Sequence, residues 1–511
     1  MSQREDSPGP HIEPADEANR ALLANVHPSG WVSPEPAPSY DLVVIGAGTA
    51  GLVSAAGAAG LGARVALVER DLMGGDCLNV GCVPSKALVR AARAFADARD
   101  AGAFGVVLPS PPQVDFPAVM ERMRRLRAHL SRTDSAERFA GLGVDVFLGQ
   151  GRFVAADAVE VGGKRLRFGR AVIATGARSA PPPVPGLPDA GYLTNETVFS
   201  LTDLPPRLAI LGAGPIGCEL AQTFARFGAR VSLIEAGPQV LPHEDADAAE
   251  RIVAALRRDA VIVLLGTKAV AARRRGAETI LEVEHGGTRS EVIADAVLVA
   301  VGRLPNVDGL DLERAGVACD ASRGVRVDDH LRTTNPRIFA AGDVCTPWKF
   351  THHSDAQARI VLRNALFLGR ARASALTLPW CTYTDPEVAH VGLSEADARE
   401  RGVRVRSFVQ DLGDVDRAVL DGETDGFVKI LVREGSDEIV GATIVARHAG
   451  ESISELTLAI VAGIGLGRLA DVIHPYPTQA EAIRKLGDTY NRTRLTPFVK
   501  RLLAAWLAWR R

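Results

Sequence analysis

Gly74-Gly75-Asp76-Cys77-Leu78-Asn79-Val80-Gly81-Cys82-Val83-Pro84-Ser85-Lys86 is the stretch around which the rest of the chain is organised. Four residues separate Cys77 from Cys82 in it. If one helix carries both cysteines, positions five apart lie within about two turns on neighbouring faces, so the two sulfurs can approach each other. We therefore expect a disulfide that opens to two thiols, one of them better exposed. A static bridge, or two buried free cysteines, is the alternative.

Composition sets broad limits on the function. A chain of 511 residues is too long for one core and predicts three or four domains. With 47% hydrophobic and 23% charged residues it has the composition of an ordinary globular protein, and a net charge of −2 argues against a nucleic-acid partner. Six cysteines are too few for a disulfide scaffold, which favours redox chemistry for the close pair. We expect the scattered cysteines to be packed residues rather than ligands: Cys218, Cys319, Cys345 and Cys381.

Residues 1–39 form a proline-rich extension. They contain no apolar run of signal-peptide length, and the sequence shows no membrane-spanning stretch, so a cytoplasmic location is expected. We predict a partly disordered arm with a short helix around residues 16–26.

A glycine-rich fingerprint follows the strand expected at residues 40–45. In it Gly46 makes the turn, Gly48 admits a pyrophosphate and Gly51 lets the next helix meet the strand. The following strand ends at Glu69, which is placed to bind an adenosine ribose. Strand, turn, helix and terminal acid together predict a dinucleotide site, and a tight turn without a ligand is the alternative.

A second fingerprint follows the strand expected at residues 208–211, with Gly212, Gly214 and Gly217 in the same places. This repeat implies two dinucleotides, or one binding copy and one degenerate copy. Its strand ends at Glu235, whose carboxylate fits a free ribose 2′-hydroxyl and repels a 2′-phosphate. We therefore predict a preference for NADH over NADPH.

Further strands end at positions where a ligand can approach the backbone. Apolar strands lead into Ala-Thr-Gly and Gly-Asp sequences, and the latter places a carboxylate near a cofactor's hydroxyl groups. A helix expected near Ser354 would point its positive end at a polar ring edge. We assign to cofactor binding, besides the fingerprints, Gly151, Thr175, Gly176, Gly302 and Asp343.

The chain changes character from about residue 376. Alternating strands at 428–432 and 439–446, followed by a helix from Ser452, predict an antiparallel sheet with helices, which is a separate domain. The last segment, residues 491–511, has six basic residues and no acidic one. It is too short to span a bilayer. A helix there could lie on an anionic membrane or dock on a partner, but packing on its own protein is the favoured interpretation.

Two fingerprints, the Cys-x4-Cys stretch and the Gly-Asp strand resemble the flavin-dependent pyridine nucleotide–disulfide oxidoreductases over roughly residues 40–490. The resemblance implies an α/β fold with two Rossmann-like dinucleotide-binding domains and a C-terminal α+β dimerisation domain, in a homodimer. The implied division is an extension (1–39), an FAD domain in two parts (40–190 and 302–375), an NAD domain (191–301), a dimerisation domain (376–490) and a basic amphipathic tail (491–511).

The resemblance also implies roles for residues in the site. FAD would occupy the first fingerprint and NAD(P)H the second, and Asp343 would hydrogen-bond the ribityl chain. Cys82 would lie against the flavin as the charge-transfer thiol, while Cys77 would exchange with the acceptor and could, with Cys82, bind a substrate metal. Lys86 and Glu219 match the ion pair beside the flavin's reactive nitrogen, and no structural metal is expected.

Departures from the family pattern bear on the acceptor. Tyr476, followed by Glu481, stands where lipoamide dehydrogenase and glutathione reductase carry a histidine paired with a glutamate. A tyrosine with a pKa near ~10 is a poor base at neutral pH, and this arrangement resembles mercuric reductase. Yet the tail has no vicinal cysteine pair, and residues 1–39 contain no cysteine. His474 could replace the missing base, although a structural role is favoured.

Three functions follow. The first is an NADH-dependent, FAD-containing reductase of Hg(II), another soft metal ion or a thiol-reactive electrophile. The second is a lipoamide dehydrogenase-like or other disulfide reductase that uses His474. The third is an oxidant-sensing flavoprotein docked by its basic tail. Intact fingerprints with Lys86 and Glu219 favour turnover over sensing.

Overall fold

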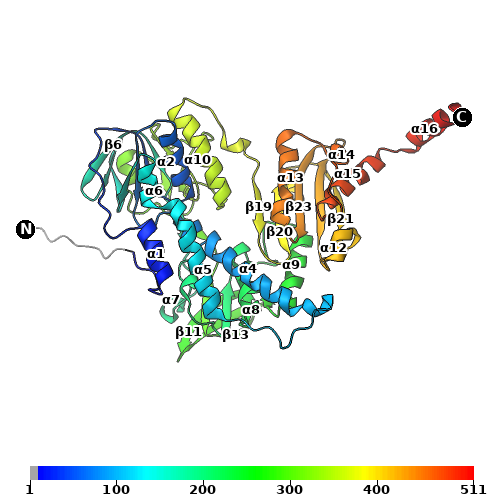
Figure 1. Cartoon of the computed structure of the whole chain (residues 1–511), viewed down its shortest axis with the longest axis horizontal. Helices are drawn as coiled ribbons and strands as arrows, with labels where there is room; N and C mark the ends of the chain where they lie inside the picture. Colours follow the sequence, from blue (N-terminus) through cyan, green and yellow to red (C-terminus); the bar gives the residue numbers. More distant parts are fainter. Residues whose placement is uncertain (1–9) are drawn as a thin grey trace, which may run out of the picture.

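The computed structural model describes residues 10–511. Its first sheet has the parallel order β3 (Val144–Leu148), β2 (Val65–Glu69), β1 (Tyr40–Ile45) and β6 (Lys164–Ile173). On its other side β6 pairs with β18 (Ile338–Ala340), which comes from much later in the chain. These strands are buried on both faces, as parallel strands must be, with α2 (Thr49–Gly60) and α10 (Thr351–Leu366) packed together beside the sheet (Figure 1). The helix expected near Ser354 therefore begins three residues earlier, at Thr351.

A second parallel sheet runs in the order β10 (Ile262–Leu264), β9 (Arg230–Ile234), β8 (Arg207–Leu211) and β14 (Ala296–Val299). A three-stranded antiparallel sheet of β11 (Thr267–Arg275), β12 (Glu278–His285) and β13 (Thr288–Ala294) adjoins it. In both parallel sheets the first strand of the fingerprint lies in the interior, so its glycine turn falls at the carboxyl edge where nucleotides bind.

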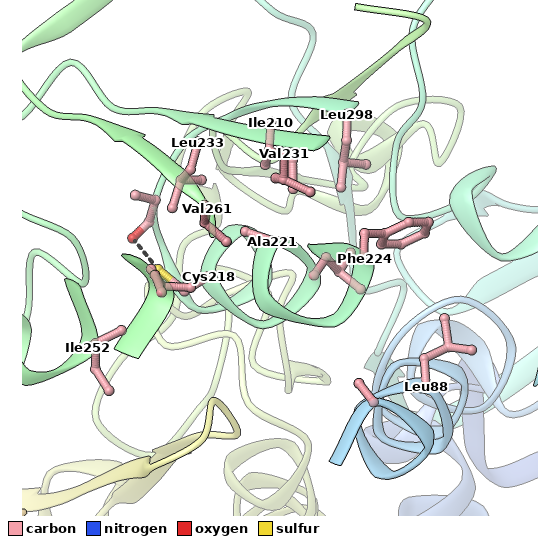
Figure 2. Packing of buried hydrophobic residues seen from close by; sticks show 14 of the residues in the cluster. Leu88, Ile210, Cys218, Ala221, Phe224, Val231, Leu233, Ile252, Val261 and Leu298 are labelled. Atoms are coloured by element: carbon pink, nitrogen blue, oxygen red, sulfur yellow. Dashed lines mark hydrogen bonds between the residues drawn. The ribbon is translucent and has the colours of Figure 1, made fainter. Parts of the chain in front are cut away.

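Helix α8 (Pro215–Arg226) joins the second sheet to the cysteine stretch. Figure 2 shows its residues Cys218, Ala221 and Phe224 beneath the buried strand residues of this sheet. Cys218 Sγ donates to Ala213 O at 3.3 Å, so this cysteine is a packed residue, as expected. On its other side α8 packs against α4 (Cys82–Arg99), whose Leu88 belongs to the same core. The two nucleotide-binding units therefore share a core close to Cys82.

The third unit is the predicted antiparallel sheet with helices. Its strand order is β19 (Pro379–Thr382), β20 (Glu387–Gly392), β23 (Ile439–Ala446), β22 (Phe427–Arg433) and β21 (Val405–Asp411). Helices α13 (Ala449–Ala462) and α15 (Glu481–Thr493) pack on it, and α13 begins three residues before the expected Ser452 (Figure 1). The fold class, with two Rossmann-like units and an α+β unit, is confirmed.

Residues 10–39 are not the arm that their composition predicts. The predicted helix is present as α1 (Glu17–Val26), and Asp16 caps it by accepting from Asn19 N. Leu22 and Val26 are fully buried in the first core. Against α5 (Phe116–Leu130), Arg127 donates to Asn19 Oδ1 at 2.7 Å. A buried arginine needs a partner, so this contact holds the extension down. The prediction for residues 1–9 lies outside the described residues.

The tail also differs from the prediction. Residues 497–509 form α16 (Pro497–Trp509), and no residue of this helix is buried. Packing on its own chain is therefore wrong as an interpretation, and Figure 1 shows α16 (red) projecting away from the third unit. Cys319 is likewise exposed instead of packed. Within residues 10–511, no helix combines the length and apolar character needed to cross a bilayer.

A buried polar joint connects the second and third units. Trp380 Nε1 donates to Glu244 Oε1 at 2.6 Å, and the His390 ring stacks on Trp380 at 4.4 Å. Nearby, buried Lys429 pairs with Asp245 at 2.8 Å. Burial raises the pKa of Glu244 to about 7, because the hydrogen bond from Trp380 and the charge of Lys429 only partly compensate for the lost water and Asp245 adds to the rise.

Glu244→Gln should change how stability depends on pH. The native state keeps a proton on Glu244 that the unfolded chain releases, so its contribution to the free energy of unfolding is present below about pH 4.5 and lost as pH rises through about 7. Glutamine keeps the acceptor for Trp380 without a charge. We expect a gain of about 1–3 kcal/mol near pH 8 and none near pH 4 in urea unfolding. Exposed Glu250→Gln on α9 (Ala246–Arg258) is the control; an equal gain at both pH values would contradict the assignment.

Candidate active site

The two close cysteines lie on two helices. Cys77 belongs to α3 (Gly75–Asn79), while Cys82 is the first residue of α4. Gly81 between them has φ −135° and ψ −111°, which ends helical geometry, and a Cβ there would lie 2.8 Å from Asp76 O. The expectation of one shared helix is therefore wrong, and the sulfurs approach because the chain turns at Gly81. Both are free thiols here, and each shifts the acidity of the other.

The two thiols differ in acidity. The hydrogen bond from Cys77, together with Lys86 and Thr351, lowers the pKa of Cys82 to about 6 against the effect of burial. Cys82 Sγ lies 3.4 Å from Thr351 Oγ1, at the positive end of α4. The same hydrogen bond, with burial, raises the pKa of Cys77. Near neutral pH the reduced pair thus holds a thiolate at Cys82 and a proton at Cys77.

The predicted ion pair is present. Lys86 Nζ donates to Glu219 Oε2 at 2.8 Å, and Glu219 is 4% exposed. Its other oxygen accepts from Tyr383 N at 2.9 Å, and the Tyr383 ring lies 4.7 Å from Lys86 Nζ. Burial opposes the charge on Lys86, but Glu219 and Cys82 outweigh it and raise its pKa. Since Lys86 is one turn after Cys82, its charge faces the thiolate.

The first glycine turn is built for close backbone approach. Gly46 has φ +100°, and a Cβ there would lie 2.4 Å from Ala174 O. A Cβ on Gly51 would lie 1.8 Å from Gly46 O, so only glycine lets helix meet strand. Glu69 is buried and accepts from Ala47 N at 2.6 Å, and burial raises its pKa.

The second turn repeats this geometry. Gly212 has φ +98°, and a Cβ on Gly217 would lie 1.9 Å from Gly212 O. Glu235 Oε2 accepts from Ala213 N at 2.8 Å, the bond that Glu69 makes in the first copy. The second fingerprint is therefore structurally intact, which argues against a degenerate copy.

One cavity of about 2200 Å³ joins both turns to the cysteines. Three assigned glycines act elsewhere: Gly51 and Gly217 pack helix on strand, and Gly151 lines a separate small pocket beside Glu69. The cavity lining includes the remaining assigned residues: Gly46, Gly48, Glu69, Cys77, Cys82, Lys86, Thr175, Gly176, Gly212, Gly214, Glu219, Glu235, Gly302 and Asp343.

The lining fits dinucleotide cofactors. Buried Arg303 Nε lacks a hydrogen-bond partner among the described residues, with Asp343 Oδ2 3.8 Å away. Burial raises the pKa of Asp343, which awaits polar partners of the kind that sugar hydroxyls provide. Gly48 and Gly75 approach so closely that a Cβ on Gly75 would lie 2.6 Å from Gly48 Cα, which leaves bare backbone facing the cavity. The glycine cradle, the unpartnered Nε of Arg303 and the buried acid Asp343 together suit FAD at the first turn.

The sequence analysis did not predict three residues that contact the site: Thr351, Tyr383 and Arg303. Thr351 lies in the first turn of α10, which the sequence placed at Ser354. Tyr383 follows β19 from the third unit, and only tertiary structure brings it to Lys86. Arg303 directly follows Gly302 in the sequence and pairs with Asp76 in the structure. This pair of opposite charges is the one feature by which the sequence could have indicated Arg303 as a site residue.

The residues expected at the acceptor do not line this chain's cavity. Tyr476 is 70% exposed and its hydroxyl donates to Asp416 at 2.8 Å, while Glu481 accepts from Arg484 at 2.8 Å. In the homodimer that the family resemblance implies, both residues would instead lie beside the cysteine pair of the partner subunit. His474 has Nε2 3.1 Å from Glu455 and Nδ1 3.1 Å from Val472 O, so both ring nitrogens are engaged.

Comparisons with known proteins agree with this geometry. The profile described as "Pyridine nucleotide-disulphide oxidoreductase" matches residues 40–358, and its "dimerisation domain" matches residues 378–486. Mercuric reductase from Staphylococcus aureus is 34% identical over 89% of this chain and 83% of its own. Dihydrolipoyl dehydrogenase from Thermus scotoductus is 34% identical over 89% and 98%. The HOCl-induced flavoprotein disulfide reductase RclA from Escherichia coli superposes with a TM-score of 0.79 at 30% identity, covering 88% and 99%.

Lys86→Met should raise the pKa of Cys82. In the reduced, FAD-loaded protein, alkylation of Cys82 by iodoacetamide should rise with pH around a midpoint of about 6, because only the thiolate reacts. Removing the facing cation should shift that midpoint up by about one unit. Mass spectrometry of the Cys82 peptide gives the rate at each pH. Lys164→Met, remote on β6, should leave the midpoint unchanged; a wild-type midpoint near ~8.5 would refute the thiolate assignment.

Proposed function

Because the chain belongs to the pyridine nucleotide–disulphide oxidoreductase family, whose members use FAD and NAD(P)H, we propose that it carries electrons from NADH through FAD and the Cys77–Cys82 pair to a soft, thiol-binding metal ion. The observation that carries the proposal is the pairing of a Cys82 thiolate with a Cys77 thiol in the cavity, together with Tyr476 at the position where lipoamide dehydrogenase and glutathione reductase carry a histidine. The dimerisation-domain match supports a homodimer.

Reduction of the Cys77–Cys82 disulfide leaves the pair in a defined protonation state. Bound FAD would supply the two-electron chemistry that connects the nicotinamide to the disulfide. Two electrons and one proton open the Cys77–Cys82 disulfide to one thiolate and one thiol, which is the state that the two acidities favour. Lys86, held by Glu219, stabilises the thiolate at Cys82, and the proton stays on Cys77.

The choice of acceptor depends on whether a side chain can act as a base beside the Cys77–Cys82 pair. Exchange with an organic dithiol or disulfide needs a group that takes and returns a proton near neutral pH. Tyr476 does not suit this role, since its hydrogen bond to Asp416 raises its pKa further, and His474 already has both nitrogens engaged. A soft metal ion needs only sulfur: it binds both thiolates, Cys77 releases its proton, and the ion takes the electrons as the disulfide re-forms. One Hg(II) takes both electrons, and two Cu(II) take one each.

Two relatives support a metal acceptor by their names. One is the mercuric reductase of Staphylococcus aureus, and the other is the Escherichia coli reductase, for which a Cu(II) complex has been solved. The dihydrolipoyl dehydrogenase relative is equally identical in sequence, so the acceptor rests on the site rather than on similarity.

Glu235 supports the choice of NADH. Its carboxylate caps the second turn and lines the cavity, where a ribose 2′-hydroxyl can donate to it and a 2′-phosphate would be repelled. The division of the chain into domains expected from the sequence is part of this proposal.

Metal acceptors should support turnover where disulfides do not. With anaerobic NADH the protein should form the long-wavelength thiolate–flavin absorption band. We then expect NADH oxidation with Hg(II) or Cu(II), and at least about tenfold lower kcat/KM with lipoamide or glutathione disulfide. Cys82→Ser should abolish both the band and the turnover, while the exposed-cysteine variant Cys319→Ser should keep both. Faster turnover of lipoamide would overturn the metal assignment.

Glu235→Gln should weaken discrimination between the dinucleotides. Losing the carboxylate removes a charge-assisted hydrogen bond to the ribose and the repulsion of a phosphate, so kcat/KM for NADH should fall about tenfold while that for NADPH holds or rises. Steady-state kinetics with both donors at a fixed acceptor gives the ratio. Glu291→Gln on the exposed face of β13 is the matched control. The proposal fails if the wild-type protein prefers NADPH.

A further inference from the structure

Helix α16 has two chemically distinct faces. At about 100° per residue, Phe498, Leu502, Trp506 and Trp509 fall on one face, and Val499, Leu503 and Leu507 extend it. Lys500 and Arg501 fall on the opposite side, together with Ala504 and Ala508. Thr496 caps the helix by accepting from Val499 N, and Pro497 occupies its first turn. The segment is therefore a well-formed amphipathic helix.

The apolar face has no partner within the described chain. Phe498 is 71% exposed and Trp509 is 77% exposed, and none of the helix is buried. Figure 1 shows α16 standing clear of the third unit, beyond α15. Scattered exposed apolar residues are ordinary, but two tryptophans, a phenylalanine and three leucines gathered on one helix face indicate an interaction surface.

The charges of residues 491–511 indicate what kind of surface the apolar face of α16 binds. Residues 491–511 carry six positive charges and no negative one. Lys500 and Arg501 lie on the polar face of α16, and Arg510 and Arg511 lie at its C-terminal end. Arg492 and Arg494 lie just before it, at the end of α15. A second copy of α16 would carry the same charges and be repelled, whereas an anionic surface is complementary. Since the whole chain has a net charge of −2, residues 1–490 carry −8, so such a surface would attract this segment and on balance repel the rest of the chain.

From these observations we propose that α16 binds the surface of membranes that contain anionic lipid. The helix lies in the interface, with its apolar face among the acyl chains and its basic residues at the phosphate level. Thirteen residues give a length of about 20 Å, suited to lying on a bilayer and too short to cross one. Tryptophan is the side chain that settles at this boundary. The proposal is independent of which acceptor the redox site uses.

Vesicle binding tests the proposal. FAD-loaded full-length protein is sedimented with vesicles of phosphatidylcholine alone or with about a quarter phosphatidylglycerol. We expect binding to the anionic vesicles that weakens with salt, and little binding to phosphatidylcholine alone. Leu502→Glu/Trp506→Glu should lower partitioning at least about tenfold by placing acids on the apolar face. Lys500→Gln/Arg501→Gln should lower it about tenfold by removing basic charge.

Control variants on the body of the protein distinguish a specific effect of α16 from a general effect of charge or misfolding. Val107→Glu adds an acid at an exposed apolar residue on the body, and Arg326→Gln/Arg370→Gln removes two exposed charges there; both should bind like wild type. All variants should keep bound FAD and NADH oxidation. Equal binding by the Leu502/Trp506 variant, or equal binding to both vesicle types, would overturn the proposal. So would an absence of vesicle binding with an α16-dependent gain in mass by light scattering, which would make a second copy the partner.

Discussion

The ion pair between Lys86 and Glu219 is the contact on which the rest of the site depends. It joins α4, which carries Cys82, to α8, which follows the second glycine turn. A buried pair of this kind adds little net stability, because the cost of removing both charges from water offsets their attraction. The ion pair matters because of where it lies. It fixes the distance between the two nucleotide-binding units and places a cation where the Cys82 thiolate needs one, while Tyr383 N ties the third unit to the same carboxylate.

Motifs with a strict backbone requirement could be predicted from the sequence. Gly46 and Gly212 must adopt positive φ, and Gly51 and Gly217 leave no room for a Cβ, so their spacing predicted both turns and the acids Glu69 and Glu235 that close them. Lys86 and Glu219 were found through the family resemblance, because residues 133 apart in sequence are joined only by the packing of α4 on α8.

What the sequence missed depends on contacts that local patterns do not encode. Helical spacing suggested that Cys77 and Cys82 share a helix, but Gly81 breaks it, and the break is what turns the sulfurs toward each other. Composition suggested a disordered extension, yet Leu22 and Val26 supply enough apolar burial, and Arg127 enough polar complementarity, to order α1. An amphipathic pattern in α16 was read as a face for the chain's own core, although the same pattern equally describes a helix with no intramolecular partner.

The ordered extension affects the cavity in a further way. Residues 10–13 line it, and the helix that follows them, α1, is anchored by Leu22 and Val26 in the first core. Part of the cavity wall is thus supplied by the extension, and the burial of α1 in the first core anchors it. The stability of that core therefore bears on the shape of the binding cavity. A substitution that loosens α1 would alter the cavity from a distance, through local unfolding with its own free energy, while both glycine turns keep their geometry.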